Sequence, residues 1–241
     1  MQKTGMQKAG MQKAGAVFIV VVAGAISAGL SGCKVSDVTT TKSISSESDA
    51  HNDSGAVNIS KMGGGIDVDS APHGANLSTM GGDIHVGDVG SYAKVKTMGG
   101  SITIDHATGS VDATTMGGPI SIGHVTGAIK ATTMGGDITA REVGASSDRR
   151  DVELTSSGGT ITLTVPKDFP MDVQITLAHT KNAPRSYEII DHVGLQQQET
   201  PDWDNSLGSP RKYIRAAGRV GSGLNHIVIK TINGDVILKQ E

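Results

Sequence analysis

The sequence is poor in cysteine and in aromatic residues, and each shortage excludes common classes of protein. A single cysteine, Cys33, excludes an intramolecular disulfide framework and a zinc site built from several cysteines. Six aromatic side chains in 241 residues cannot build the aromatic-rich core of an ordinary globular enzyme. The hydrophobic fraction of 37% is nevertheless too high for a fully disordered chain. These values leave repetitive β-structure with a thin aliphatic core.

A concentrated positive charge is also missing. The first 32 residues carry only Lys3, Lys8 and Lys13 as charged side chains, whereas the other 209 residues carry 18 basic and 24 acidic ones. This distribution argues against a nucleic acid as partner. The basic lead consists of a short unit, Met-Gln-Lys-(Thr/Ala)-Gly, written three times, and we exclude it from the fold.

An apolar run from Ala16 to Leu30 follows the basic lead. It is as long as the core of a signal peptide and shorter than the ~20 residues that span a membrane. The run ends at Leu30-Ser31-Gly32-Cys33, which resembles the bacterial lipobox. The resemblance implies cleavage before Cys33 and acyl chains on that residue, which anchor the protein to a membrane. The alternative is an uncleaved anchor helix with an incidental cysteine.

The N-terminal segments therefore predict that the protein is located in the bacterial cell envelope. Residues 1–32 are expected to be a lipoprotein signal peptide, and residues 33–54 a Ser/Thr-rich tether. Lys34 stands where an Asp would favour the inner membrane, so the outer membrane, on its periplasmic or surface face, is expected in a Gram-negative source. Within the tether, the stretch from Val38 to Ile44 is an alternative first strand.

A Met-Gly-Gly tripeptide recurs every 18 residues, without insertion or deletion. The five copies begin at Met62, Met80, Met98, Met116 and Met134. Five apolar columns share this period, and their members in the second copy are Ile84, Val86, Val89, Ala93 and Val95. The period predicts an all-β fold, a single-stranded β-solenoid (β-helix-like) with 18-residue coils whose strands pair in parallel with those of the next coil.

The Gly-Gly pairs are expected at the corners of the coils. There they would supply positive φ and let adjacent coils turn without clashes of Cβ atoms. Thr97, Thr115 and Thr133 precede three of the tripeptides, and we expect their hydroxyls to stack as a ladder.

The regular period stops after Val143, so residues 55–241 divide into regular coils over 55–144 and longer coils with an arm over 145–241. Further strands are expected near residues 152–154, 161–165, 173–177, 227–229 and 236–238. The stretch between His179 and Asn225 has no clear period and contains three of the few aromatic residues, Tyr187, Trp203 and Tyr213. We expect an irregular C-terminal arm that caps the open end of the solenoid; a partner-binding arm is the alternative.

Repeated Gly-Gly-Asp-Ile turns, as at Gly81–Ile84 and Gly135–Ile138, and a terminal Thr-Ile-Asn-Gly-Asp-Val at Thr231–Val236 resemble the bacterial adhesin-type domain called toastrack. The resemblance covers roughly residues 55–241. It implies a β-helix-like envelope domain of unknown function, found at cell surfaces and in membrane-stress contexts, without an established enzymatic activity.

One polar column in the repeats suggests a metal site. Asp88, His106, His124 and Glu142 are one coil apart, and each precedes an apolar position, so all four are expected to point outward. Stacked imidazoles and carboxylates could hold a divalent cation. A solvated charge ladder is the simpler interpretation, and no metal is expected.

The five methionines pose a problem of orientation. Counting back from inward Ile102 places Met98 inside the coil, whereas counting forward from inward Val95 places it outside. We expect the thioethers to be buried as packing at the corners. The alternatives are an exposed apolar stripe that suits a partner, a lipid or a neighbouring rod, and copper binding through thioethers.

No nucleophile elbow, phosphate loop or paired-carboxylate cleft is recognisable, so no catalytic residue and no cofactor are expected. Arg141, Arg149 and Arg150, with Asp148 and Asp151, are interpreted as a solvated loop. We expect a non-enzymatic envelope lipoprotein whose solenoid is a binding, adhesion or scaffold surface, with an envelope stress response as one setting. Its partners would be the membrane, a protein or glycan of the envelope, or a second copy. An envelope polysaccharide-active β-helix enzyme is the alternative.

Overall fold

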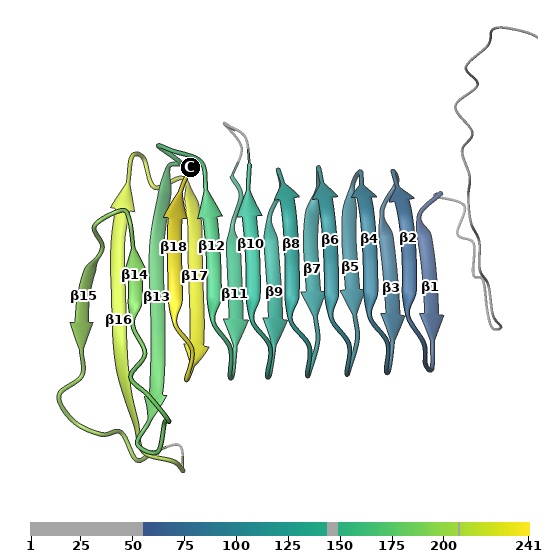
Figure 1. The fold of residues 1–241 in the computed structure, drawn as a ribbon. Coiled ribbons are helices and arrows are strands. Elements are labelled where there is room, and N and C mark those ends of the chain that lie inside the picture. Colours follow the sequence, from purple (N-terminus) through teal and green to yellow (C-terminus); the bar gives the residue numbers. More distant parts are fainter. Residues whose placement is uncertain (1–54, 144–148, 207) are drawn as a thin grey trace, which may run out of the picture. The chain divides into compact units, whose positions relative to one another are not determined.

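The computed structural model describes residues 55–143, 149–206 and 208–241. The predicted signal peptide, the lipobox with Cys33, the tether and the alternative strand within it all lie outside the described residues. Every regular element among the described residues is a β-strand, and the strands form two sheets, which we call sheet A and sheet B (Figure 1).

Sheet A has ten strands and sheet B has eight. In spatial order, sheet A consists of β1 (Val57–Lys61), β3 (Ala75–Thr79), β5 (Tyr92–Lys96), β7 (Ser110–Thr114), β9 (Ile129–Thr133), β11 (Val152–Ser156), β17 (Asn225–Ile232), β13 (Met171–Thr180), β16 (Arg211–Val220) and β15 (Gln196–Glu199). Sheet B consists of β2 (Ile66–Ala71), β4 (Ile84–Val89), β6 (Ile102–Ala107), β8 (Ile120–Val125), β10 (Ile138–Glu142), β12 (Ile161–Val165), β18 (Val236–Gln240) and β14 (Ile189–Asp191).

From β1 to β14, successive strands of the chain alternate between the two sheets, and in the regular coils each pair of strands makes one coil. Within a sheet the regular coils pair in parallel at an offset of one repeat, as Val57 with Ala75 in sheet A and Ile66 with Ile84 in sheet B. The expected β-solenoid is confirmed. The parallel pairing leaves no coil able to cover its own apolar edges without its neighbours.

The core between the sheets is aliphatic and narrow. In the second coil the five expected inward residues are all buried: Ile84, Val86, Val89, Ala93 and Val95. They alternate with exposed or half-buried side chains along β4 and β5, as a strand with one buried face requires. The space between the sheets holds only one layer of side chains from each sheet. Small and branched side chains therefore fill it, and large aromatic rings are few.

The two glycines at each corner differ in their surroundings. Only the second one is required by the close approach of the neighbouring coil. In the repeats from the second coil onward neither glycine has positive φ, so the expectation of left-handed corners is wrong there. The second glycine is needed for space: a Cβ at Gly100 would lie 2.1 Å from the carbonyl oxygen of Gly82 in the preceding coil. A Cβ at Gly99 would lie 3.9 Å from its nearest neighbour, which is ordinary contact.

A ladder of buried hydroxyls connects the corners of successive coils. Thr115 Oγ1 donates to the carbonyl of Gly100 at 2.9 Å, and Thr133 Oγ1 donates to that of Gly118 at 3.0 Å. The same bond recurs with Ser156 in the sixth coil. Each hydroxyl therefore satisfies a carbonyl of the coil before it, which explains why Thr or Ser stands at this position from the second coil to the sixth, whereas the first coil has Lys61 there.

The fifth coil lacks one residue that the earlier coils contain. Between β8 and β10 the register shifts, so that Gly123 has no partner, Arg141 pairs with His124, and Glu142 pairs with inward Val125. The prediction that Glu142 belongs to the outward column is therefore wrong. Glu142 is 1% exposed, because the loss of the bulge residue changes which side chains face inward.

The arm adds strands to the C-terminal end of both sheets, as expected for a cap. β14 extends sheet B beyond β18, and β16 with β15 extends sheet A beyond β13 through antiparallel pairs. β1 and β2 lie at the other end of the sheets (Figure 1). The last coil, β17 and β18, is not the last in space, because β17 inserts between β11 and β13.

Candidate functional site

The outward column of sheet B retains three of its four predicted members. Asp88 pairs with His106, and His106 pairs with His124, whose ring stacks on that of His106 with centroids 5.0 Å apart and planes at 17°. All three side chains are exposed, and Arg141 rather than Glu142 occupies the next place. Among the described residues no group of three or more His, Asp or Glu side chains is arranged to hold a metal ion.

A second histidine cluster lies on the same face and was missed by the sequence analysis. His85 Nδ1 is 2.9 Å from Asp67 Oδ1, and His85 Nε2 is 3.0 Å from Asp105 Oδ2. The bond to Asp67, and then that to Asp105, raises the pKa of His85 above its usual range. The available signal was that Asp67 and His85 occupy the same outward position in consecutive coils.

Glu142 forms a buried ion pair with Arg150. Arg150 Nη1 donates to Glu142 Oε1 at 2.6 Å and to the carbonyl of Val143 at 2.9 Å. Glu142 Oε2 is buried without a hydrogen-bond partner. The residue also lines a hollow of about 190 Å³, together with Thr164 and Glu241. Burial raises the pKa of Glu142 to about 7, although the bond to Arg150 opposes this.

The interpretation of the arginines as a solvated loop is half right. Arg149 and Asp151 form an exposed ion pair at 2.9 Å. Arg150 is 7% exposed and belongs to the buried pair with Glu142, so for this residue the interpretation is wrong. Asp148 lies outside the described residues. Arg150 stands between the charged residues Arg149 and Asp151, so the local sequence does not indicate that it is buried. Its burial follows from the register of β10, which turns its partner Glu142 inward.

The five methionines lie on the outside of the corners, so the expectation of buried thioethers is wrong. The exposed fractions decide the point: 84% at Met62, 49% at Met80, 43% at Met98, 48% at Met116 and 57% at Met134. The inner three are the least exposed because each has a methionine on the coil at either side. Together with the adjoining first glycines they form an edge that runs along the solenoid, which we call the methionine edge.

The three aromatic residues of the arm all contact cations. The Arg185 guanidinium lies 4.5 Å from the ring centroid of Tyr187, Lys212 Nζ lies 5.4 Å from that of Trp203, and Arg215 lies 5.2 Å from that of Tyr213. The Trp203 ring also meets His179 of β13 edge to face, at 5.6 Å. The three cation–π pairs lie within the arm, whereas the His179–Trp203 contact and the pairing of β16 with β13 connect the arm to the solenoid.

A hollow of about 450 Å³ lies where the arm meets the solenoid, and we call it the junction hollow. His179 and Lys181 line it from the end of β13, and Arg185, Tyr187 and Trp203 line it from the arm. Glu199 is its acidic lining residue. The hollow therefore combines a cationic lining with aromatic side chains, which suits an anionic ligand.

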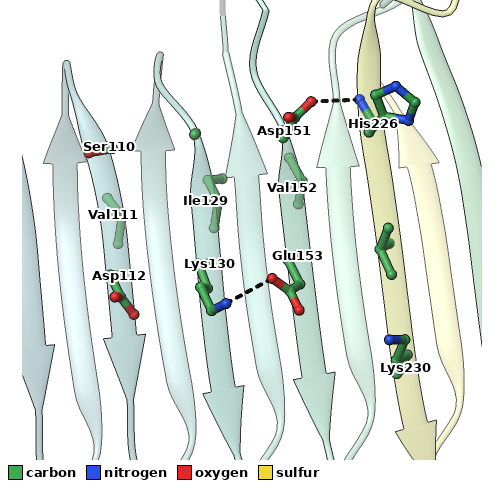
Figure 2. A pocket seen from close by; sticks show the side chains of 12 residues that line it. Ser110, Val111, Asp112, Ile129, Lys130, Asp151, Val152, Glu153, His226 and Lys230 are labelled. Carbon is green, nitrogen blue, oxygen red and sulfur yellow. Dashed lines mark hydrogen bonds and ion pairs between the residues drawn. The ribbon is translucent and has the colours of Figure 1, made fainter.

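A larger hollow, of about 520 Å³, lies on the outer face of sheet A across β7, β9, β11 and β17 (Figure 2). Two of its charged groups are already bonded: Lys130 Nζ is 2.9 Å from Glu153 Oε2, and Asp151 Oδ1 accepts from the backbone N–H of His226 at 3.0 Å. Asp112 and Lys230 also line the hollow, and Figure 2 draws no bond from either side chain to the other lining residues.

Across the described ranges 55–143, 149–206 and 208–241, no helix has the length and hydropathy needed to cross a membrane.

Comparison with known families gives one clear match. The model of the family described as Toastrack DUF4097 matches residues 36–182, which include every strand from β1 to β13. The match begins earlier than the resemblance in the sequence suggested, and it ends before the arm and the last coil. Comparison with curated proteins and with solved structures found no match. Because the model covers more than half of the chain, this protein belongs to the toastrack family, whose domain has no known function.

Proposed function

We propose that this protein is a non-enzymatic, lipid-anchored component of the bacterial cell envelope whose solenoid is a scaffold that presents a binding surface to an anionic envelope partner. Cys33 is the anchor, and the Ser/Thr-rich segment up to residue 54 is the tether. The solenoid between them and the arm is a rigid spacer, because each coil is hydrogen-bonded to the next along both sheets.

The observation that carries the proposal is the junction hollow. It lies at the C-terminal end of the sheets, opposite to β1. The β1 end is the one that follows the anchor and the tether in the sequence. Lys181 supplies positive charge, Arg185 adds a guanidinium that also pairs with Asp235 at 2.6 Å, and Trp203 and Tyr187 supply rigid contact area. A site of this chemistry at the far end of a spacer suits capture of an anionic polymer or surface within the envelope.

The anchor is tested by metabolic labelling with a fatty-acid analogue and by fractionation of cell membranes. The wild-type chain should incorporate the label and sediment with the membranes. Cys33→Ser should lose the label and appear in the soluble fraction. Label on both chains, or on neither, would reject the lipoprotein assignment.

The binding surface is tested with the full-length protein in detergent and purified envelope glycan as the probe. Cosedimentation should be strong at low salt, weaken as salt rises, and be lost in Trp203→Ala. Tyr92→Ala is the matched control, because Tyr92 is an exposed aromatic residue on β5, far from the arm. Equal loss in both variants would place binding elsewhere. Release of soluble sugars during the assay would favour the alternative, an envelope polysaccharide-active enzyme.

A further inference from the structure

The solenoid itself does not require methionine at the corner. In the sixth coil Ser156 takes the place of Thr133, so Ser157 occupies the methionine position and is exposed. In the last coil Thr231 takes the place of Ser156, so Ile232 occupies that position. The same coil therefore closes with a polar residue or with a branched apolar one. The thioethers of the first five coils have no structural task that other side chains could not perform.

The first glycine of each pair is equally unexplained by the fold. A Cβ at Gly81 would meet nothing within 4 Å, and one at Gly117 would lie 3.5 Å from the nearest atom. In the last coil Asn233 occupies this position. The methionine edge is thus a row of flexible, exposed thioethers, and beside it a row of glycines leaves the sulfur atoms uncovered.

The spacing of this row matches one class of ligand. Neighbouring coils are ~4.8 Å apart, which is the separation of hydrogen-bonded strands. Two sulfur atoms on opposite sides of one metal ion, with bonds of about 2.3 Å as in zinc thiolates, lie about 4.6 Å apart. A methionine side chain has three rotatable bonds between backbone and sulfur, and these can absorb the small difference.

From these observations we propose that the methionine edge binds soft monovalent metal ions, Cu(I) or Ag(I), each held by the thioethers of adjacent coils. Thioethers are soft, neutral ligands that select Cu(I) over the hard divalent cations. The edge position itself carries a thioether in all five coils and no carboxylate or imidazole. Five thioethers in a row provide at most two separate pairs, which sets an upper limit of two ions bound by pairs. This inference does not depend on the proposed function or on the lipid anchor.

Adjacency rather than the number of thioethers is the property to test, and the chain offers a matched pair of variants. Met80→Leu/Met116→Leu leaves three methionines with no two on neighbouring coils. Met62→Leu/Met134→Leu also removes two thioethers, but it leaves three on consecutive coils. Both variants replace exposed side chains by leucine, so both should keep the wild-type circular dichroism and thermal unfolding.

The measurement is protection of the thioethers from mild peroxide by Ag(I), mapped by peptide mass spectrometry on the full-length protein in detergent. Coordination occupies a sulfur lone pair that oxidation needs, so Ag(I) should slow sulfoxide formation at the methionine edge. Buried Met171 should resist peroxide with or without the metal. Anaerobic competition with bicinchoninate measures the affinity of the protein for Cu(I), the other metal ion of the proposal.

The expected result is loss of protection and of Cu(I) retention in Met80→Leu/Met116→Leu, with both kept in Met62→Leu/Met134→Leu. Ser157→Met should add a sixth thioether to the row and extend protection to that residue. Equal behaviour of the two double variants would overturn coordination by adjacent coils. Loss of binding in His106→Asn/His124→Asn, with the methionines intact, would assign the metal to the imidazoles instead and overturn the inference.

Discussion

At Gly99 and Gly100 the same amino acid occurs for two different reasons, and alanine should distinguish them. Gly100→Ala places a Cβ 2.1 Å from the carbonyl oxygen of Gly82, so a whole coil must shift and we expect a loss of about 3 kcal/mol in the free energy of unfolding. Gly99→Ala meets nothing closer than 3.9 Å and should change it by less than about 1 kcal/mol. Urea unfolding of both variants checks this, and comparable losses would contradict the division of roles.

Glu142 should make stability fall as the pH rises. Its pKa is raised from 4.5 to about 7 in the folded protein, so folding favours the protonated form. The unfolded chain releases this proton near pH 4.5 and the folded chain only near 7. Between these values the free energy of unfolding therefore decreases, by up to about 3 kcal/mol for this group.

Glu142→Gln tests this dependence, because glutamine keeps the shape of the side chain and cannot ionise. The variant should lose most of the slope between pH 5 and pH 7 in urea titrations. At pH 8 it should be at least as stable as the wild type, since the neutral amide avoids the cost of burying the ionised Glu142 carboxylate. A slope that persists unchanged would show that Glu142 is ionised throughout this range.

What could be predicted from the sequence at this scale was the periodic part. The inward positions from Ile66 to Ile138 were found because each recurs unchanged in spacing. The burial of Glu142 and the exposure of Met98 were predicted wrongly, because both depend on a local change of register or direction that a count along the chain does not contain. The extra residue at Gly123 is recognisable only when its partner strand is known.

At the scale of one element, the outer face of sheet B carries a second pH dependence in a different range. His85, protonated between Asp67 and Asp105, has a pKa raised above 6.5 in the folded protein. Its contribution to stability is complete below pH 6.5 and is lost as the pH rises through the folded-state value. His85→Gln should therefore be less stable than the wild type at pH 6, and the difference should shrink by pH 9.

The control for this prediction is His124→Gln on the same face. His124 stacks on the ring of His106 and forms no ion pair with a carboxylate among the described residues, so its replacement removes none of the charge interactions that His85 makes. Because His85 is 44% exposed, raising the salt concentration should also reduce the effect of its replacement. An effect that is independent of both pH and salt would point to lost packing instead of charge.

The order of the elements shows where prediction from one sequence ends. The strands at Val152, Ile161 and Ile227 were expected, but the sequence gives no sign that β17 lies between β11 and β13. That order depends on where the chain re-enters the stack after the arm, which is a choice among parallel pairings of similar apolar strands. Likewise the junction hollow unites the end of β13 with Trp203 of the arm, and no local pattern connects them.

At the scale of the whole molecule, the solenoid should tolerate the deletion of one complete coil. It should not tolerate a deletion that is one residue shorter than a coil. Deletion of residues 103–120 joins Ile102 to Ser121 and keeps every inward and outward position, because β4 would pair with β8, and β5 with β9, in the register that β6 and β7 now provide. Deletion of residues 103–119 joins Ile102 to Ile120 and places two adjacent isoleucines in one strand, so one of them must face water. The first variant should fold, with a smaller free energy of unfolding and a smaller dependence of it on urea, since less surface is buried. The second should unfold at a much lower urea concentration or not fold at all. Circular dichroism and urea titration distinguish the two, and a stable 17-residue deletion would mean that the corners, and not the alternation of side chains along the strands, determine the register of the coils.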